Sequence, residues 1–275
     1  YAGRDTAFCA VYRHKGGRAA GGRAVGFLGE YDALRGQGHG CAHHMQTPAM
    51  IGAAMALRGV LESSDQPFEI HVIGTPSEES LDGGKNEMAA HGGFDHIDVA
   101  FMVHGSTLTQ LETPSLALIE MDVEFHGKTA HAGIAPYAGR SAVDAVTMLQ
   151  TGLGLMRNHL KDSSRVSNIV LAGGTAVNSV PDFAKVKVEI RHSSMAYLES
   201  VEQWTREIAQ AAAMATQTQV QITPVAHIYN TTINDAMGAL LMECAEKFAC
   251  DGIAPPRKDC GSTDFGAVTH RLPSC

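Results

Sequence analysis

Four side chains that can bind metal or move protons lie within six positions of one loop. They are His39, Cys41, His43 and His44, and they follow an apolar segment with the length of a β-strand. Three kinds of site fit these residue types. The loop could hold a metal ion, could pair a cysteine nucleophile with a histidine base, or could be rich in histidine without any chemical role.

A second set of candidate ligands follows later strands. Glu78 and Glu79 come directly after one apolar run, and His104 lies at the end of another. In an open α/β sheet the carboxyl ends of the strands meet at one crevice, so we expect these side chains to approach Cys41 and His43. Imidazole, thiolate and carboxylate together suit zinc. Paired glutamates also allow one to bind metal while the other acts as a general base.

Each of these residues has an ordinary explanation when it is taken alone. A histidine after a strand is usually a hydrogen-bonded loop residue, a buried cysteine is usually inert, and adjacent glutamates are usually solvated. Their joint occurrence at one predicted sheet edge favours a functional site. A thiol enzyme built on Cys41 and His43 is the weaker interpretation, because residues two positions apart in a loop need special geometry and a third orienting group.

The composition indicates a water-soluble globular protein that acts on a small molecule. The 275 residues are 44% apolar and 18% charged, and no apolar run is long enough for a membrane span. A net charge of -8 with scattered basic residues argues against a nucleic-acid surface. The six cysteines have no disulfide-framework spacing, so we expect a reducing, cytoplasmic compartment.

The order of the predicted elements indicates an α/β domain. Strands alternate with helices, which favours a mostly parallel sheet covered by helices. In the first long helix we expect Thr47 to act as the cap and Pro48 to occupy the first helical position. The predicted strands of this domain are the apolar runs 6–12, 24–31, 68–76 and 98–105.

The middle third of the chain has the order β-α-β-β-α-β of a ferredoxin-like unit. Its first run, 119–127, alternates in the manner of a strand with one exposed face. We therefore expect an inserted α+β domain at 118–229. It interrupts a first domain formed by 1–117 and 230–275, which we expect to be incomplete at both ends.

Five motifs occur in order along the chain: EYDALRGQGHGCAHHM, GTPSEESLDGGKNEMAAHGGFDHIDVAFMVHG, GKTAHAGIAPYAGRSAVDAV, GGTAVNSVPDFAKVKVEIRHSS and GSTDFGAVTHRLPS. Together they resemble the amidohydrolase branch of zinc metallopeptidase family twenty, and within it the aminoacylase-1-like protein 2 group. The branch also includes aminobenzoyl-glutamate hydrolases. The resemblance implies a zinc-peptidase-like catalytic domain with a mostly parallel sheet, and an inserted ferredoxin-like domain that serves as a lid or for dimerisation.

The resemblance also implies a site with two divalent metal ions, zinc or alternatively manganese. On the matching positions, the ligands would be Cys41, His43, Glu79 and His104, and Glu78 would be the general base. The bound ions would lower the pKa of water towards neutrality, and Glu78 would move its proton to the leaving amine.

Three residues of the inserted domain match positions that the family uses with its substrate. His131 would be catalytic, as a donor to the substrate carbonyl oxygen that often acts across a dimer interface. Asn178 and Arg191 would contact the substrate, Arg191 through a bidentate fork on a carboxylate. Their ordinary explanations are a turn asparagine and an exposed arginine at a strand end. The implied substrate is a dipeptide or an N-acyl amino acid, and the implied assembly is a homodimer through the inserted domain.

The chain departs from the family pattern at two places. His44 stands where the family usually has a carboxylate or an amide. The last ligand histidine of the family lies shortly beyond the segment that matches Pro273 and Ser274, whereas this chain ends at Cys275 and His270 is no substitute. Two functions therefore stay open. The first is a metal-dependent amidohydrolase or dipeptidase, and the alternative is a catalytically impaired module that binds metal or dimerises.

Overall fold

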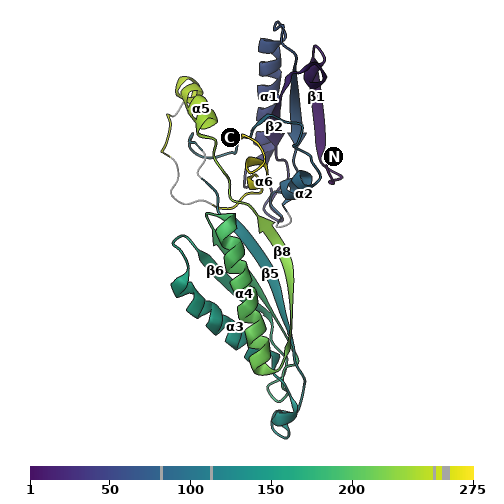
Figure 1. Ribbon diagram of the computed structural model, residues 1–275, viewed down its shortest axis with the longest axis vertical. Coiled ribbons are helices and arrows are strands. Elements are labelled where there is room, and N and C mark those ends of the chain that lie inside the picture. The colour runs from purple at the N-terminus through teal and green to yellow at the C-terminus, as the bar shows by residue number, and fades with distance from the viewer. Residues whose placement is uncertain (81–82, 112–113, 250–251, 256–260) are drawn as a thin grey trace. The chain divides into compact units, whose positions relative to one another are not determined.

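The computed structural model describes residues 1–80, 83–111, 114–249, 252–255 and 261–275 (Figure 1). The chain divides into two compact units. Tyr1–Ser115 and Ile228–Cys275 form the first unit, and Leu116–His227 form the second. Among the helices of the described residues, none has both the length and the apolar character needed to cross a membrane.

The first unit is built on a mixed sheet whose described strands follow the order β1-β3-β2-β4. Strand β2 pairs in parallel with both β3 and β4, and β1 pairs antiparallel with β3. The predicted α/β class with a mostly parallel sheet is confirmed. The elements are β1 (Phe8–His14), β2 (Arg23–Gly29), α1 (His43–Leu61), β3 (Phe68–Gly74), α2 (Gly84–Ala90), β4 (Val99–Phe101), α5 (Asp235–Phe248) and α6 (Gly266–Thr269), with a 3₁₀ turn at Gly17–Ala20.

Apolar clusters that include helix residues lie on both faces of the central strands of this sheet. Successive side chains of a strand point to opposite faces. Phe27 and Ile70 belong to one apolar cluster, which includes Met50 of α1. Leu28 and Ile73 belong to another, which is formed with α2 and α6. Burial on both faces explains why the central strand β2 reads as a nearly continuous apolar run.

Helix α1 begins at His43, five residues before the predicted first position at Pro48. Ala42 occupies the N-cap with a left-handed φ of 63°, and no side chain in the described part of the chain caps the helix. The Thr47 hydroxyl instead donates to the Glu30 carbonyl oxygen at 2.6 Å. The predicted roles of Thr47 and Pro48 are therefore wrong, because a contact with the end of β2 determines the position of Thr47. The earlier start makes His43 the first helical residue.

The second unit has the strand order β6-β7-β5-β8, which is that of a ferredoxin-like sheet. Strand β7 pairs antiparallel with both β5 and β6. The inserted α+β unit is confirmed, and Figure 1 shows α3 and α4 on one face of its sheet. Its elements are β5 (Ala117–His126), α3 (Ala142–Met156), β6 (Arg165–Ala172), β7 (Phe183–His192), α4 (Met195–Thr216) and β8 (Gln219–Ile228), with 3₁₀ turns at Pro136–Ala138 and Arg157–His159.

The polar side chains of β5 are partly shielded by ion pairs with β7, whereas the alternation of its sequence predicts a solvated face. Lys187 of β7 lies 2.5 Å from Glu120, and Lys185 lies 2.7 Å from Asp122. Glu120 is only 6% exposed. Acidic side chains of β5 thus pair with lysines of the neighbouring antiparallel strand β7. The sequence of β5 alone does not reveal these partners and predicts that its acidic side chains are solvated.

Helix α3 offers a matched test of how the second unit is stabilised. Leu149 is fully buried, whereas Leu155 on the same helix is 64% exposed. We expect Leu149→Ala to lower the free energy of unfolding by about 2–5 kcal/mol, because it leaves a cavity as well as removing apolar contacts. Leu155→Ala should change it by less than about 0.5 kcal/mol. Urea denaturation measures both, and equal losses would contradict this packing.

Candidate metal centre

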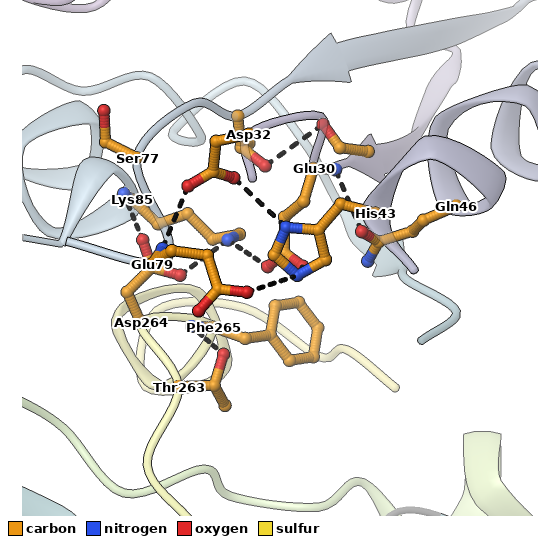
Figure 2. A network of polar contacts seen from close by, with 12 residues as sticks. Glu30, Asp32, His43, Gln46, Ser77, Glu79, Lys85, Thr263, Asp264 and Phe265 are labelled. Carbon is orange, nitrogen blue, oxygen red and sulfur yellow. Dashed lines mark hydrogen bonds and ion pairs between the residues drawn. The ribbon is translucent and has the colours of Figure 1, made fainter. Parts of the chain in front are cut away.

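His43 is buried at the start of α1 with carboxylates on both sides of its ring (Figure 2). Its Nδ1 lies 3.2 Å from Asp32 Oδ1. Its Nε2 lies 3.2 Å from Glu30 Oε2 and 3.9 Å from Glu79 Oε1. When Nδ1–H donates to Asp32, the lone pair of Nε2 points towards the other two carboxylates. A carboxylate on the far ring nitrogen is typical of a histidine that binds metal.

Asp32 contacts both His43 and Glu79. It also accepts a hydrogen bond of 2.9 Å from the backbone N–H of Glu79. Burial alone would raise the pKa of Asp32, but His43 and this N–H hold it below its ordinary value. Burial would likewise lower the pKa of His43, but Asp32 and Glu30 raise it. One ionised side chain therefore positions both His43 and Glu79.

Three buried atoms at the centre of this cluster have no hydrogen-bond partner among the described residues. They are Glu30 Oε2, His43 Nε2 and Glu79 Oε1. An unsatisfied buried polar group costs about 1–3 kcal/mol, and more when it is charged. A divalent cation between these atoms would satisfy all three. The side chains that are present therefore fit a metal ion.

A fully buried lysine lies beside this cluster. The Nζ of Lys85, on α2, lies 2.5 Å from Glu30 Oε1 and 2.6 Å from Asp264 Oδ1. Its backbone N–H also donates to Asp264 Oδ2 at 2.8 Å. Burial alone would lower the pKa of Lys85, but Asp264 and Glu30 raise it well above its ordinary value, so the amine is charged. Neither Lys85 nor Asp264 is among the residues predicted from the sequence, although both lie within the five motifs.

Glu78 and Glu79 are neighbours in sequence but face different groups. Glu79 approaches His43, whereas Glu78 also lies close to Glu30 and Asp264. Burial, followed by the charge of Glu30, raises the pKa of Glu78 to about 7. A carboxylate that titrates near neutral pH can both accept and return a proton there, which is the property needed in a general base.

Cys41 lies beside the carboxylates of the cluster. A hydrogen bond with Glu79, together with burial and the charges of Glu79 and Glu78, raises the pKa of the Cys41 thiol to about 11. A thiol with this pKa is protonated at neutral pH and is a poor nucleophile. The raised pKa therefore argues against the thiol enzyme that the sequence left open, and the role of Cys41 as a metal ligand stays a prediction.

His104 is exposed and lies close to His43. The two rings meet edge to face with centroids 5.5 Å apart, and one nitrogen of His104 lies within 4.8 Å of ligand atoms of Glu30 and His43. His39 and His44 contact each other at 4.9 Å between centroids and are both exposed. The structure thus brings together the predicted residues of the first unit, and their individual roles stay predictions.

The predicted substrate residues lie in the second unit. The Nδ1 of His131 accepts a hydrogen bond of 3.2 Å from the N–H of Gly133. The loop of His131 lies beside that of Asn178, because the N–H of Ala132 donates to the Asn178 carbonyl oxygen at 2.9 Å. Arg191 donates from Nε and Nη2 to Glu189, at 2.7 and 3.0 Å. A substrate carboxylate would have to compete with Glu189 for Arg191.

We expect Lys85→Met to destabilise the protein strongly. The substitution keeps an unbranched side chain that is only one atom shorter, but it leaves Glu30 and Asp264 buried without their cation, which typically costs about 3–5 kcal/mol. Lys15→Met is the matched control, because Lys15 pairs with the exposed Asp65 and should contribute little. Urea denaturation in the presence of a chelator tests both, and an unaffected Lys85→Met protein would refute the assigned charge pairing.

The raised pKa of Glu78 predicts a pH dependence of stability in the metal-free protein. The folded state favours the protonated form, so the contribution of Glu78 is fully present below its ordinary pKa of 4.5 and is lost as the pH rises through about 7. Glu78→Gln removes this dependence, so its unfolding midpoint should fall less between these pH values than that of the unsubstituted chain. Parallel profiles of the two proteins would contradict the assigned pKa.

Comparison with known proteins identifies relatives of the chain. Residues 26–275 match peptidase family M20/M25/M40. The Xaa-Arg dipeptidase of Mus musculus is 35% identical over 263 residues, which cover 93% of this chain and 61% of that protein. One of the subunits of the p-aminobenzoyl-glutamate hydrolase of Escherichia coli (strain K12) is 32% identical over 236 residues, which cover 78% of this chain and 49% of that protein. The chain thus spans about half to three fifths of the length of these relatives.

Solved structures share the fold. A dinuclear metal-binding peptidase of the M20 family from Bacillus subtilis aligns with a TM-score of 0.72 at 18% identity, covering 97% of this chain and 74% of that one. An aminobenzoyl-glutamate utilization protein from Klebsiella pneumoniae aligns with a TM-score of 0.73 at 24% identity, covering 97% of this chain and 67% of that one. The family match covers both units and the histidine–carboxylate cluster, and so the chain belongs to peptidase family M20/M25/M40.

Proposed function

We propose that this protein is a metal-dependent amidohydrolase that cleaves the amide bond of dipeptides or N-acyl amino acids. The observation that carries the proposal is the convergence of unpartnered ligand atoms from Glu30, His43 and Glu79 beside Glu78, whose pKa is raised to about 7. The names of the two relatives support the reaction class, because a dipeptidase and an aminobenzoyl-glutamate hydrolase both cleave amide bonds.

The residues proposed to hold two divalent ions are Cys41, His43, Glu79 and His104. Glu30 is an additional candidate ligand, because its Oε2 lies 3.2 Å from His43 Nε2. Thiolate and imidazole together favour zinc, whereas a set richer in carboxylates would favour manganese. When bound, such ions supply positive charge that polarises an amide carbonyl and lowers the pKa of water from ~15.7 towards ~7.

Glu78 is proposed to move the proton of the reaction. It would accept a proton from the attacking water and deliver it to the leaving amine, a role worth roughly 10² to 10⁴ in rate. Asp32 would keep His43 in the tautomer that offers Nε2, and Lys85 would hold Glu30 in place. His131 would donate to the developing oxyanion, and donors of this kind contribute about 3–4 kcal/mol. Asn178 and Arg191 would contact the substrate.

We also propose a homodimer formed through the second unit. Strand β6 lies at an edge of its sheet, where backbone groups are open to pairing with another chain. Apolar side chains on it are exposed, among them Ile169 at 59% and Leu171 at 50%. The absence of disulfide bonds at Cys9, Cys41 and Cys244 supports the proposal of a cytoplasmic location. Cys250 and Cys260 lie outside the described residues.

Glu78→Gln tests the proposed reaction. We expect a loss of at least about 10² in the hydrolysis rate, because the amide cannot accept the proton, while the metal content of the protein is unchanged. Glu62→Gln is the control, because Glu62 is exposed on the same unit and should leave both quantities unaffected. An active Glu78→Gln protein would refute the assigned base.

The substrate panel should contain dipeptides ending in Arg or Lys, N-acyl amino acids and aminobenzoyl-glutamate, with metal content measured on the same sample. Hydrolysis of the basic dipeptides would indicate a substrate class like the one in the name of the mouse relative. Hydrolysis of aminobenzoyl-glutamate would indicate the substrate in the name of the bacterial relative. Bound metal without hydrolysis of any substrate would favour the alternative, a non-catalytic module that binds metal and dimerises.

A further inference from the structure

A second cluster of potential metal ligands lies in the first unit and shares no residue with the centre described above. It consists of Cys9 on β1, His71 on β3 and His96 in the segment between α2 and β4. One ligand atom from each residue lies within 4.8 Å of those of the other two. The proposed hydrolysis assigns no role to any of them.

The sulfur of Cys9 and one nitrogen of His71 already have the spacing of two ligands on one metal ion. Cys9 Sγ and His71 Nδ1 are 3.6 Å apart. With Zn–S near 2.3 Å and Zn–N near 2.0–2.1 Å, a tetrahedral zinc ion separates a sulfur and a nitrogen ligand by about 3.5 Å. The register places Cys9 opposite Ile73 and His71 opposite Val11, so the two side chains are diagonal neighbours on one face of the sheet.

A buried carboxylate fixes the orientation of His71. Its Nε2 lies 2.8 Å from Glu69 Oε2, and both side chains are at least nine-tenths buried. Glu69 is held in turn by the backbone N–H of Arg18 at 3.1 Å and by Arg13 Nε at 3.3 Å. With Nε2–H donated to Glu69, the lone pair of Nδ1 points to Cys9. This is the carboxylate–histidine arrangement found behind metal-binding imidazoles.

The second imidazole completes a three-ligand set. The rings of His71 and His96 lie 4.8 Å apart between centroids. Burial lowers the pKa of both histidines, which keeps them in the neutral form that binds metal. The Tyr1 hydroxyl lies 3.4 Å from His96 Nε2 and donates its proton to the Gly93 carbonyl oxygen, so its oxygen or a water can supply a fourth ligand.

The ordinary alternative is a buried polar cluster satisfied by its own hydrogen bonds. That alternative accounts for Glu69 and His71, which are buried and hydrogen-bonded to each other. It does not account for the approach of His96, a half-buried second imidazole, to the same sulfur and nitrogen atoms. A nucleophilic relay of Cys9, His71 and Glu69 would use the same contacts. It leaves His96 without a role, although a ligand atom of His96 lies within 4.8 Å of those of Cys9 and His71.

We propose that Cys9, His71 and His96 form a second metal site, which takes zinc and links β1, β3 and the segment before β4. Binding forms one Zn–S and two Zn–N bonds and releases the thiol proton of Cys9 to the solvent.

Cobalt(II) absorption tests the thiolate ligand. In the 275-residue chain, Cys41→Ser first removes the sulfur of the other centre. Addition of cobalt(II) to this variant should produce a thiolate-to-cobalt charge-transfer band, and a further Cys9→Ser substitution should abolish it. Cys244→Ser, at an exposed free cysteine on α5, is the matched control and should keep the band. Absence of the band in the folded Cys41→Ser protein, or its persistence after Cys9→Ser, would overturn the proposal.

Zinc content provides an independent measurement. His96→Gln should lower the zinc bound per chain by one equivalent, whereas His91→Gln, at an exposed histidine close in sequence, should not. Circular dichroism of the chelated proteins shows whether both variants fold. Zinc should also protect Cys9 from iodoacetamide. Alkylation of Cys9 at the same rate with and without zinc would refute the metal site and favour the thiol relay.

Discussion

The buried ammonium group of Lys85 is the charge on which the geometry of the candidate centre depends. It joins Glu30 at the end of β2 to Asp264 near the start of α6, and all three side chains are almost completely buried. Removing charges from water costs several kcal/mol per ion, and only close pairing offsets this cost. Because Lys85 engages one oxygen of Glu30, the other oxygen is directed to His43.

The two histidine clusters of the first unit share one principle. In each, a carboxylate takes one ring nitrogen and so orients the other: Asp32 acts on His43, and Glu69 acts on His71. The clusters differ in what the free nitrogen faces. His43 Nε2 faces carboxylates, which concentrate negative charge. His71 Nδ1 faces the thiol of Cys9, and the imidazole of His96 lies beside the ring of His71. The same sheet thus presents a charged site beyond its strand ends and a less charged one on its face.

The two units and much of the first centre could be predicted from the sequence, because both follow from the order of the strands and helices. Alternation of strands and helices indicated both units, and the carboxyl ends of parallel strands indicated that Cys41, His43 and Glu79 would meet. The partnership of Lys85 with Asp264 could not be predicted in this way. The two residues are 179 positions apart, and a lysine that directly follows two glycines at the start of a short helix gives no sign that it is buried. The start of α1 was misplaced for a similar reason, since the contact of Thr47 with Glu30 is tertiary.

The position of Asp264 also has a consequence for the order of folding. The first unit is discontinuous in sequence, and the second unit lies between Lys85 and its partner. Until the segment 261–275 packs against the sheet, Lys85 has only part of its compensating charge and its burial is unfavourable. The carboxylate of Glu30 is then less firmly held by Lys85, and so its position beside His43 is less fixed. The geometry of the candidate centre is therefore complete only when this segment is packed against the sheet, so a contact far along the chain would control how well the centre holds a metal.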